Sequence, residues 1–336
     1  MSADRTTLPS RVSTLGRVMR SSWIKYARAV EHQQVLARAG REFFADGDTY
    51  EYRRSDNRND EHDPLLRIEW TPTIKRPFPE RWSVVLGDVL TNFRAALDHA
   101  VWDAVHAHSG PPDRPQDIFF PIATEQASFR KNGKKLRSLL PPPVWGLIEE
   151  MQPFHETDAT TAPLEVLRWL SNVDKHRAVH VVGSTFFDVG LPLVLSDPPL
   201  DIVDEYRYEG QATDGTVVAR VTAKRPQSPQ TIEVRPTFAH GPTLQIRDNP
   251  VDFRRLGEVM DVLRDSVLAI IGHVTIMLGA PTPERDELNL GEEHDAYAPE
   301  LGGVVLGVTD HDGTRHIIGG HHRDAHDTAS DTPPAP

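Results

Sequence analysis

The sequence contains no cysteine, which excludes disulfide bridges and metal sites built from thiolates. It has no uninterrupted apolar run of the ~18 residues that a membrane-spanning helix requires, and its first residues lack the apolar stretch of a secretory signal. Walker loops, dinucleotide-binding glycine fingerprints and Gly-x-Ser-x-Gly elbows are also missing. These absences predict a cytoplasmic protein with no membrane partner, and they point to no cofactor.

The acidic excess of the chain is concentrated near its end. The 336 residues carry a formal net charge of −12, but from Pro281 onward 12 Asp and Glu accompany only 3 Arg. The preceding residues hold 37 acidic and 34 basic side chains, so this part is close to neutral and can carry a local basic patch. One basic cluster, which we interpret as a solvated face, consists of Lys131, Lys134, Lys135 and Arg137.

Hydrophobic periodicity predicts a single α+β domain over residues 13–280. Residues 1–12 are expected to form a flexible leader. Residues 281–336 are expected to form a disordered acidic tail, in which the only apolar patch is 304–308. The predicted fold class is a helical bundle packed beside a mostly antiparallel β-sheet.

Within this domain the helical period and the strand period occupy different segments. Residues 13–178 are predicted to form the helical part, which includes a short hairpin and an irregular stretch after Gly110. The polar tip of the hairpin, 55–63, is expected to be mobile. Residues 179–247 contain short β-branched runs between Gly, Pro and Asp turns, which predicts an antiparallel meander of five or six strands. A closing helix is expected over 250–278.

A long helix predicted over 80–108 combines an apolar stripe with a polar flank. Arg94 and Asp98 lie one turn apart, close enough to pair. Burying polar groups without partners costs ~1 to 3 kcal/mol each, so this flank must face solvent or another polar surface. The flank is therefore the strongest candidate site, and its other members are Asp88, Asn92, His99, Asp103 and His106.

A second predicted helix, within 162–180, ends in a crowded set of polar residues. We expect it to pack on the central helix and to place His99 and His176 in one pocket, because neither polar set can be left unpaired. The supporting polar network of this site is predicted to comprise Asp88, Asn92, Asp98, Asn172, Asp174, Lys175, His176 and Arg177.

In the run FRAALDHAVW, Arg94 and His99 are separated by four residues, and here the chain resembles the HEPN superfamily of helical-bundle nucleases. The resemblance implies a homodimer that cleaves RNA without metal, with Arg94 and His99 as catalytic residues. Ala95 departs from the pattern, since a polar residue commonly follows the arginine. The chain also resembles a family of bacterial proteins of uncharacterised activity through NFRAALDHAVW, FPI and NVDKHR, and this wider resemblance implies that both polar segments serve one site.

The chemistry of an Arg and His pair suits RNA cleavage. A histidine can transfer a proton at a ribose hydroxyl or at the leaving oxygen, while a guanidinium stabilises the charged phosphoryl oxygens. The same spacing recurs at Arg235 and His240, but Pro236 lies inside that strand-like run, so we do not interpret it as a site.

Two other interpretations remain open. A metal-dependent enzyme could use His99 and Asp103, joined by Asp88, His106 and His176, although no compact His-Glu-x-x-His motif is present. In a non-enzymatic binding or structural module, Arg94 and Asp98 would form an intrahelical salt bridge, and Asn172, Asp174 and His176 would join the two helices. The tail histidines are interpreted as part of a flexible polar segment: His311, His316, His321, His322 and His326.

Overall fold

The chain forms two compact units in the computed structural model. The described residues are 19–45, 49–176, 181–182, 190–208, 213–228, 232–237, 241–247, 253–284, 286–288, 307–309 and 315–317. Unit 1 comprises Met1–Glu42, Phe78–Val182 and Pro242–Leu301, and unit 2 comprises Phe43–Pro77, Gly183–Gly241 and Gly302–Pro336. The structure thus differs from the single domain expected over 13–280, because the early hairpin makes its contacts with strands that follow Gly183.

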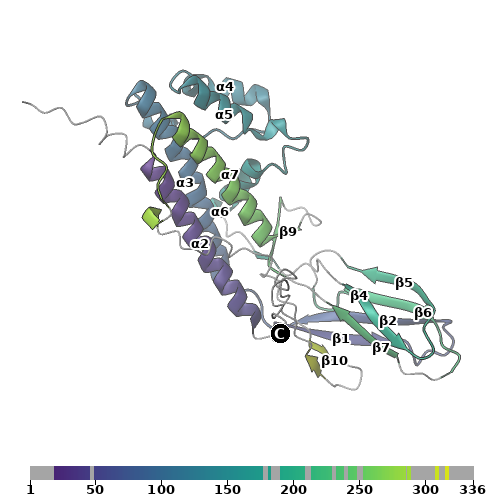
Figure 1. Ribbon diagram of the computed structural model, residues 1–336. Helices are drawn as coiled ribbons and strands as arrows, with labels where there is room; N and C mark the ends of the chain where they lie inside the picture. Colours follow the sequence, from purple (N-terminus) through teal and green to yellow (C-terminus); the bar gives the residue numbers. More distant parts are fainter. Residues whose placement is uncertain are drawn as a thin grey trace, which may run out of the picture. The chain divides into compact units, whose positions relative to one another are not determined.

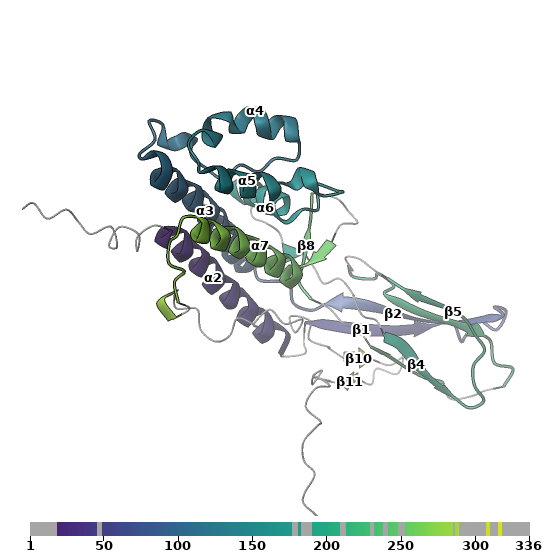
Figure 2. The ribbon, with the colours of Figure 1, turned by 45° about the horizontal axis from the view of Figure 1, so that its top comes forward.

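Unit 1 is a helical bundle, and Figures 1 and 2 show α2, α3 and α7 side by side. The helices expected over 80–108, within 162–180 and over 250–278 correspond to α3, α6 and α7, which confirms the helical part of the α+β prediction. Their bounds are α2 Arg20–Ala45, α3 Arg81–Ser109, α4 Gln126–Arg137, α5 Pro142–Glu150, α6 Pro163–His176 and α7 Leu256–Met277, with short 3-10 turns at η1 Pro115–Asp117, η2 Pro153–His155 and η3 Asp286–Leu288.

Helix α3 is the core element of unit 1. Phe93 and Leu97 are fully buried, and the helix packs against both α6 and α7. Fully burying such a side chain stabilises the fold by about 1.5 to 3 kcal/mol, so the apolar stripe read from the sequence accounts for the position of α3. The Trp23 indole nitrogen donates to the Thr275 hydroxyl at 3.0 Å, which joins α2 to α7.

Helix α4 was not predicted, since its segment shows only a basic cluster in the sequence. Its buried positions are Phe129, Gly133 and Leu136, which are too few to give a clear helical period. Trp145 of α5 lies directly over Gly133 and stacks on Phe129, with ring centroids 4.9 Å apart. The basic residues consequently project from a helix that is fixed in place by an aromatic contact.

The strands form three sheets, so the prediction of one meander is wrong although the pairing is mostly antiparallel as expected. The order in the largest sheet is β11-β10-β1-β2-β6-β5, in which β6 is central to the pairing of β2 and β5. A second ladder joins β4 to β7, and in unit 1 a third follows the order β3-β8-β9. The bounds are β1 Tyr50–Asp56, β2 Leu65–Ile74, β3 Val181–Val182, β4 Gly190–Ser196, β5 Ile202–Arg207, β6 Ala219–Lys224, β7 Ile232–Thr237, β8 Thr243–Gln245, β9 Phe253–Arg255, β10 Gly307–Thr309 and β11 Arg315–Ile317.

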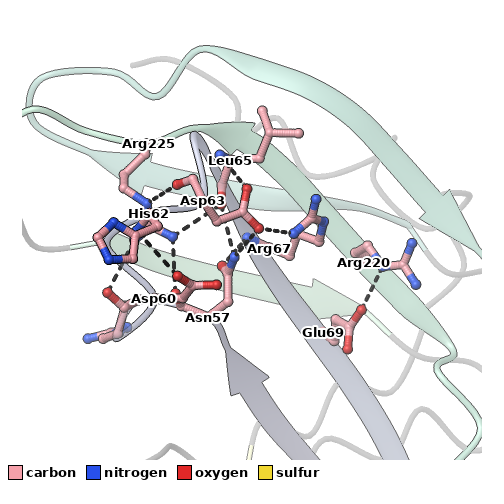
Figure 3. A network of polar contacts seen from close by, with 10 residues as sticks. Asn57, Asp60, His62, Asp63, Leu65, Arg67, Glu69, Arg220 and Arg225 are labelled. Atoms are coloured by element: carbon pink, nitrogen blue, oxygen red, sulfur yellow. Dashed lines mark hydrogen bonds and ion pairs between the residues drawn. The ribbon is translucent and has the colours of Figure 1, made fainter.

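The tip of the β1–β2 hairpin is held by a polar network, whereas the sequence predicted a mobile tip (Figure 3). Asn57 donates to the Asp63 carboxylate at 3.0 Å and accepts the Arg67 backbone N–H at 2.7 Å. Arg225, which follows β6, donates to the backbone carbonyls of Asn57, Arg58, Asp63 and Leu65. One guanidinium thus bonds several carbonyls of this loop, and sequence alone could not identify that distant partner.

Part of the predicted tail belongs to the folded units. Leu288 in η3 is only 8 % exposed. The short strand β10 overlaps the apolar patch 304–308 and pairs in parallel with β1, with Val308 opposite Tyr52. Within residues 281–336 the described elements are η3, β10 and β11.

Cutting the chain after Ala280 should destabilise unit 1 more than cutting it after Leu288. The shorter product lacks the buried Leu288 side chain, and emptying such a site costs about 2 to 5 kcal/mol. Thermal unfolding of the two truncated chains gives the comparison, with Leu288→Ala in the full chain as the control. Equal melting temperatures for both truncations would show that η3 contributes nothing.

Candidate functional site

Arg94 and Asp98 hold the backbone of one distant residue from both sides. The Arg94 guanidinium donates to the Phe120 carbonyl oxygen, and the Asp98 carboxylate accepts the Phe120 N–H at 2.9 Å. The two side chains also pair with each other at 3.2 Å. We call this arrangement the Arg94–Asp98 clamp. It joins the FPI segment to the motif on α3.

Gln152 extends the same anchoring along the segment that follows Phe120. Its amide nitrogen donates to the Pro121 carbonyl at 2.9 Å, and its amide oxygen accepts the Ala123 N–H at 2.9 Å. Gln152 is only 2 % exposed, so these bonds form away from solvent. Side chains thus satisfy backbone groups that no strand partner reaches, which fixes the connection between α3 and α4.

The clamp is largely buried and its arginine is engaged. The Arg94 side chain is 20 % exposed. Burial lowers the pKa of Arg94, while Asp98 acts in the opposite direction. A guanidinium in this position stays charged, and its Nη2 atom contacts both the Phe120 carbonyl and Asp98.

His99 and Asp103 lie on a different side of α3. Asp103 accepts the Met19 N–H at 3.0 Å and also bonds the Ser21 side chain, so it anchors the start of α2. Burial raises the pKa of Asp103, and these hydrogen bonds oppose the shift. The Nδ1 atom of His99 is buried and has no hydrogen-bond partner among the described residues. His106, one turn further, contacts Trp102 in a tilted arrangement with ring centroids 4.6 Å apart.

The helix geometry directs Arg94 and His99 to separate surfaces. Five residues of an α-helix correspond to a rotation of about 140° between the two side chains around the axis. Arg94 is directed to Phe120, whereas His99 lies beside Asp103 and the start of α2. Within one chain, the two residues proposed as a catalytic pair do not converge on a common point.

A third polar contact on α3 involves Asp174 of α6. A Cβ added at Gly87 would lie 2.3 Å from the Asp174 Oδ1, so the absence of a side chain at Gly87 makes room for this carboxylate. Burial, and then the nearby Asp88, raise the pKa of Asp174. Burial and then Arg28 lower the pKa of His32 in α2, whereas the charge of Asp88 acts in the opposite direction.

The prediction that α3 packs on α6 is confirmed, but the two helices run antiparallel. Gly87 faces Asp174, whereas Arg94 is near enough to Arg168 for its pKa to be lowered by that charge. His99 therefore lies about 18 Å along α3 from the contact with Asp174, and His176 extends beyond it in the other direction. The expected pocket shared by His99 and His176 does not form in this geometry.

The remaining residues of the predicted network do not complete a single site. The Asn92 side chain donates to the backbone carbonyl of Asp88 in its own helix at 2.8 Å. Asn172, Lys175 and His176 are exposed. Arg177 and the tail histidines fall outside the residues whose side chains the structure describes.

Sequence reasoning missed a buried carboxylate on α6. Glu165 is 2 % exposed and accepts two bonds from Arg168, at 2.6 Å each, and one from Arg247 at 2.8 Å. A glutamate followed by an arginine three residues later is a signal for a helical ion pair. The partner Arg247, which adopts φ +60° after β8, could not be identified from local spacing.

No protein-family model, curated protein or solved structure matches the chain. The HEPN resemblance and the wider bacterial resemblance consequently remain predictions. Across the described residues, no group of three or more His, Asp or Glu side chains is placed to hold a metal ion. None of the helices in the described segments has the length and apolarity needed to cross a membrane.

Proposed function

We propose that this protein is a cytoplasmic, non-catalytic binding module. In it the polar flank of α3 holds other segments of unit 1 in place. The observation that carries the proposal is the Arg94–Asp98 clamp, in which both charged groups bind the backbone of Phe120. Asp103 holds the start of α2 in the same way. Each engaged group fixes another part of unit 1, which is the role expected of a buried polar network rather than of a catalytic pair.

A metal-independent ribonuclease is the second candidate, and a specific observation favours it. The buried Nδ1 atom of His99 has no partner in the described part of the chain, and unsatisfied buried groups are often retained for chemistry. In this alternative His99 is the acid-base group, a homodimer supplies the complete site, and the substrate is RNA. Arg94 would then have to leave Phe120 in order to contact phosphate.

One assay separates the candidates. The purified full chain is incubated with mixed-sequence RNA, with and without a chelator, and its melting temperature is measured in parallel. The variants are His99→Ala and, as a matched control, His108→Ala, which lies exposed on the same helix. The binding module predicts no cleavage by any form.

Two other results would contradict the binding module. Cleavage that survives the chelator and is lost in His99→Ala, but not in His108→Ala, would replace the binding module with the ribonuclease; an acid-base residue typically contributes ~100- to 10,000-fold. Cleavage abolished by the chelator would instead favour the metal-dependent enzyme.

A further inference from the structure

Helix α4 carries five basic residues and no acidic one, and its apolar side is already covered. Phe129 and Leu136 are 2 % and 7 % exposed, and they face the Trp145 side of α5 with Gly133 between them. The opposite side is free of covering residues in the described chain. The five basic residues are Arg130, Lys131, Lys134, Lys135 and Arg137.

Three of these cations make no ion pair within the described residues. They are Lys131, Lys134 and Arg137, which we call the α4 basic face; they follow one another at three-residue steps and all are exposed. Arg130 reaches Glu149 only at 3.8 Å. Three like charges on one exposed helix face repel one another, and a bound anionic partner would reduce that repulsion.

An exposed aromatic ring follows a residue that contacts α4. Lys135 binds the Asp117 carboxylate at 3.1 Å, and Phe119 lies two residues after Asp117. Phe119 is 50 % exposed, whereas its neighbours Ile118 and Phe120 are buried. The Arg94–Asp98 clamp binds the next residue, so the Phe119 ring is presented from a fixed backbone.

We propose that the α4 basic face and Phe119 form a docking surface for a single-stranded nucleic acid. Cations that follow a phosphate backbone, beside an aromatic ring on which a base can stack, are the two components of sequence-tolerant single-strand binding. The proposal rests on the proposed function, since it names the ligand of the binding module. The proposed ligand contacts neither Arg94 nor His99, and Arg94 contributes only by holding the backbone of Phe120.

Other anionic partners fit the surface less well. A basic amphipathic helix binds a membrane by inserting its apolar side, but the apolar side of α4 is buried against α5. An acidic polypeptide would satisfy the lysines and Arg137 but would give no role to the exposed ring of Phe119. These two ligands therefore serve as competitors in the test.

The test measures fluorescence anisotropy of a labelled single-stranded RNA of about twelve nucleotides, and of the matching DNA, with the full chain. The first variant is Lys131→Glu/Lys134→Glu/Arg137→Glu. Its control, Arg20→Glu/Arg38→Glu/Arg81→Glu, changes the net charge equally at exposed positions on α2 and α3. Phe119→Ala removes the ring without changing the charge.

We expect the α4 triple variant to bind at least about tenfold more weakly and to reduce the slope of log K against log salt by about 2, since each single-strand phosphate contact contributes roughly 0.7. Phe119→Ala should weaken binding by about fivefold or more with an unchanged slope. The α2/α3 control should bind nearly as the parent does.

The proposal is overturned if the parent binds neither strand, or if the control loses as much affinity as the α4 triple variant. It is also overturned if phosphatidylserine vesicles or polyglutamate bind more tightly than the strands. Binding of RNA and DNA alike, or of one alone, supports it when the α4 triple variant weakens that binding at least about tenfold. Because cleavage is measured separately with His99→Ala, a failure here does not revive the ribonuclease.

Discussion

Replacing Arg94 with methionine should lower the free energy of unfolding by about 3 kcal/mol, because the change removes two charge-assisted hydrogen bonds from a mostly buried position. Methionine keeps much of the apolar stem of arginine. It leaves the Phe120 carbonyl without its donor and Asp98 without its counter-ion. Chemical denaturation of the full chain measures the loss.

The control for this variant is Arg130→Met, whose side chain is 65 % exposed and whose ion pair with Glu149 is 3.8 Å long. Exposed pairs of this kind contribute at most about 1 kcal/mol. Asp98→Asn should cost less than Arg94→Met, because the asparagine oxygen can still accept the Phe120 N–H. If Arg94→Met were no more destabilising than Arg130→Met, the clamp would not hold the Phe120 segment.

The sequence predicted the pairing of Arg94 with Asp98 because one helical turn brings such residues together. It could not predict that both bind Phe120, since the groups bound are a backbone carbonyl and N–H that every residue possesses. Gln152 illustrates the same limit: its side chain bonds the backbone of Pro121 and Ala123. The helical period therefore predicted which residues share the polar flank of α3. It did not predict which distant groups those residues bind.

The relative direction of two packed helices is the second property that the residue patterns did not determine. The apolar stripes of α3 and α6 indicated that the helices pack, yet stripes are equally compatible with parallel and antiparallel arrangements. The antiparallel contact joins Gly87 to Asp174 and carries His99 away from His176. One predicted site thus becomes three polar contacts along a single helix, and each contact holds a different neighbour.

For the strands too, local sequence predicted the elements but not their distant partners. Short β-branched runs and turn residues predicted the number and the antiparallel character of the strands reasonably well. The pairing of β6 with β2 depends on residues more than 140 positions apart, as in the register of Ile68 with Val221. Nothing local distinguishes that partner from the next strand in the chain, so a meander was predicted in error.

Gly133→Ala should destabilise the protein even though alanine is the better helix former. A Cβ at this position would lie 2.4 Å from the Cη2 atom of Trp145, and the indole is fixed by stacking on Phe129. Overpacking of this kind costs about 1 to 3 kcal/mol, against a gain in helix propensity of about 1 kcal/mol. The expected net change is a loss of up to about 2 kcal/mol in the free energy of unfolding.

Gly146→Ala and Gly272→Ala are matched controls, because nothing lies within 4 Å of a Cβ added at either helical glycine. Both should stabilise the protein by about 0.5 to 1 kcal/mol. At Gly87 the obstacle is the Asp174 carboxylate, which can rotate aside more easily than a buried ring, so Gly87→Ala should cost less than Gly133→Ala.

A second variant identifies the cause of the loss. Trp145→Phe removes the outer ring of the indole, so in that background Gly133→Ala should become neutral or stabilising, and the two substitutions should couple by more than about 1 kcal/mol. If Gly133→Ala cost the same in both backgrounds, the contact between α4 and α5 would not be set by Trp145. The orientation of the α4 basic face depends on this contact, since the buried ring determines which side of α4 is turned to solvent.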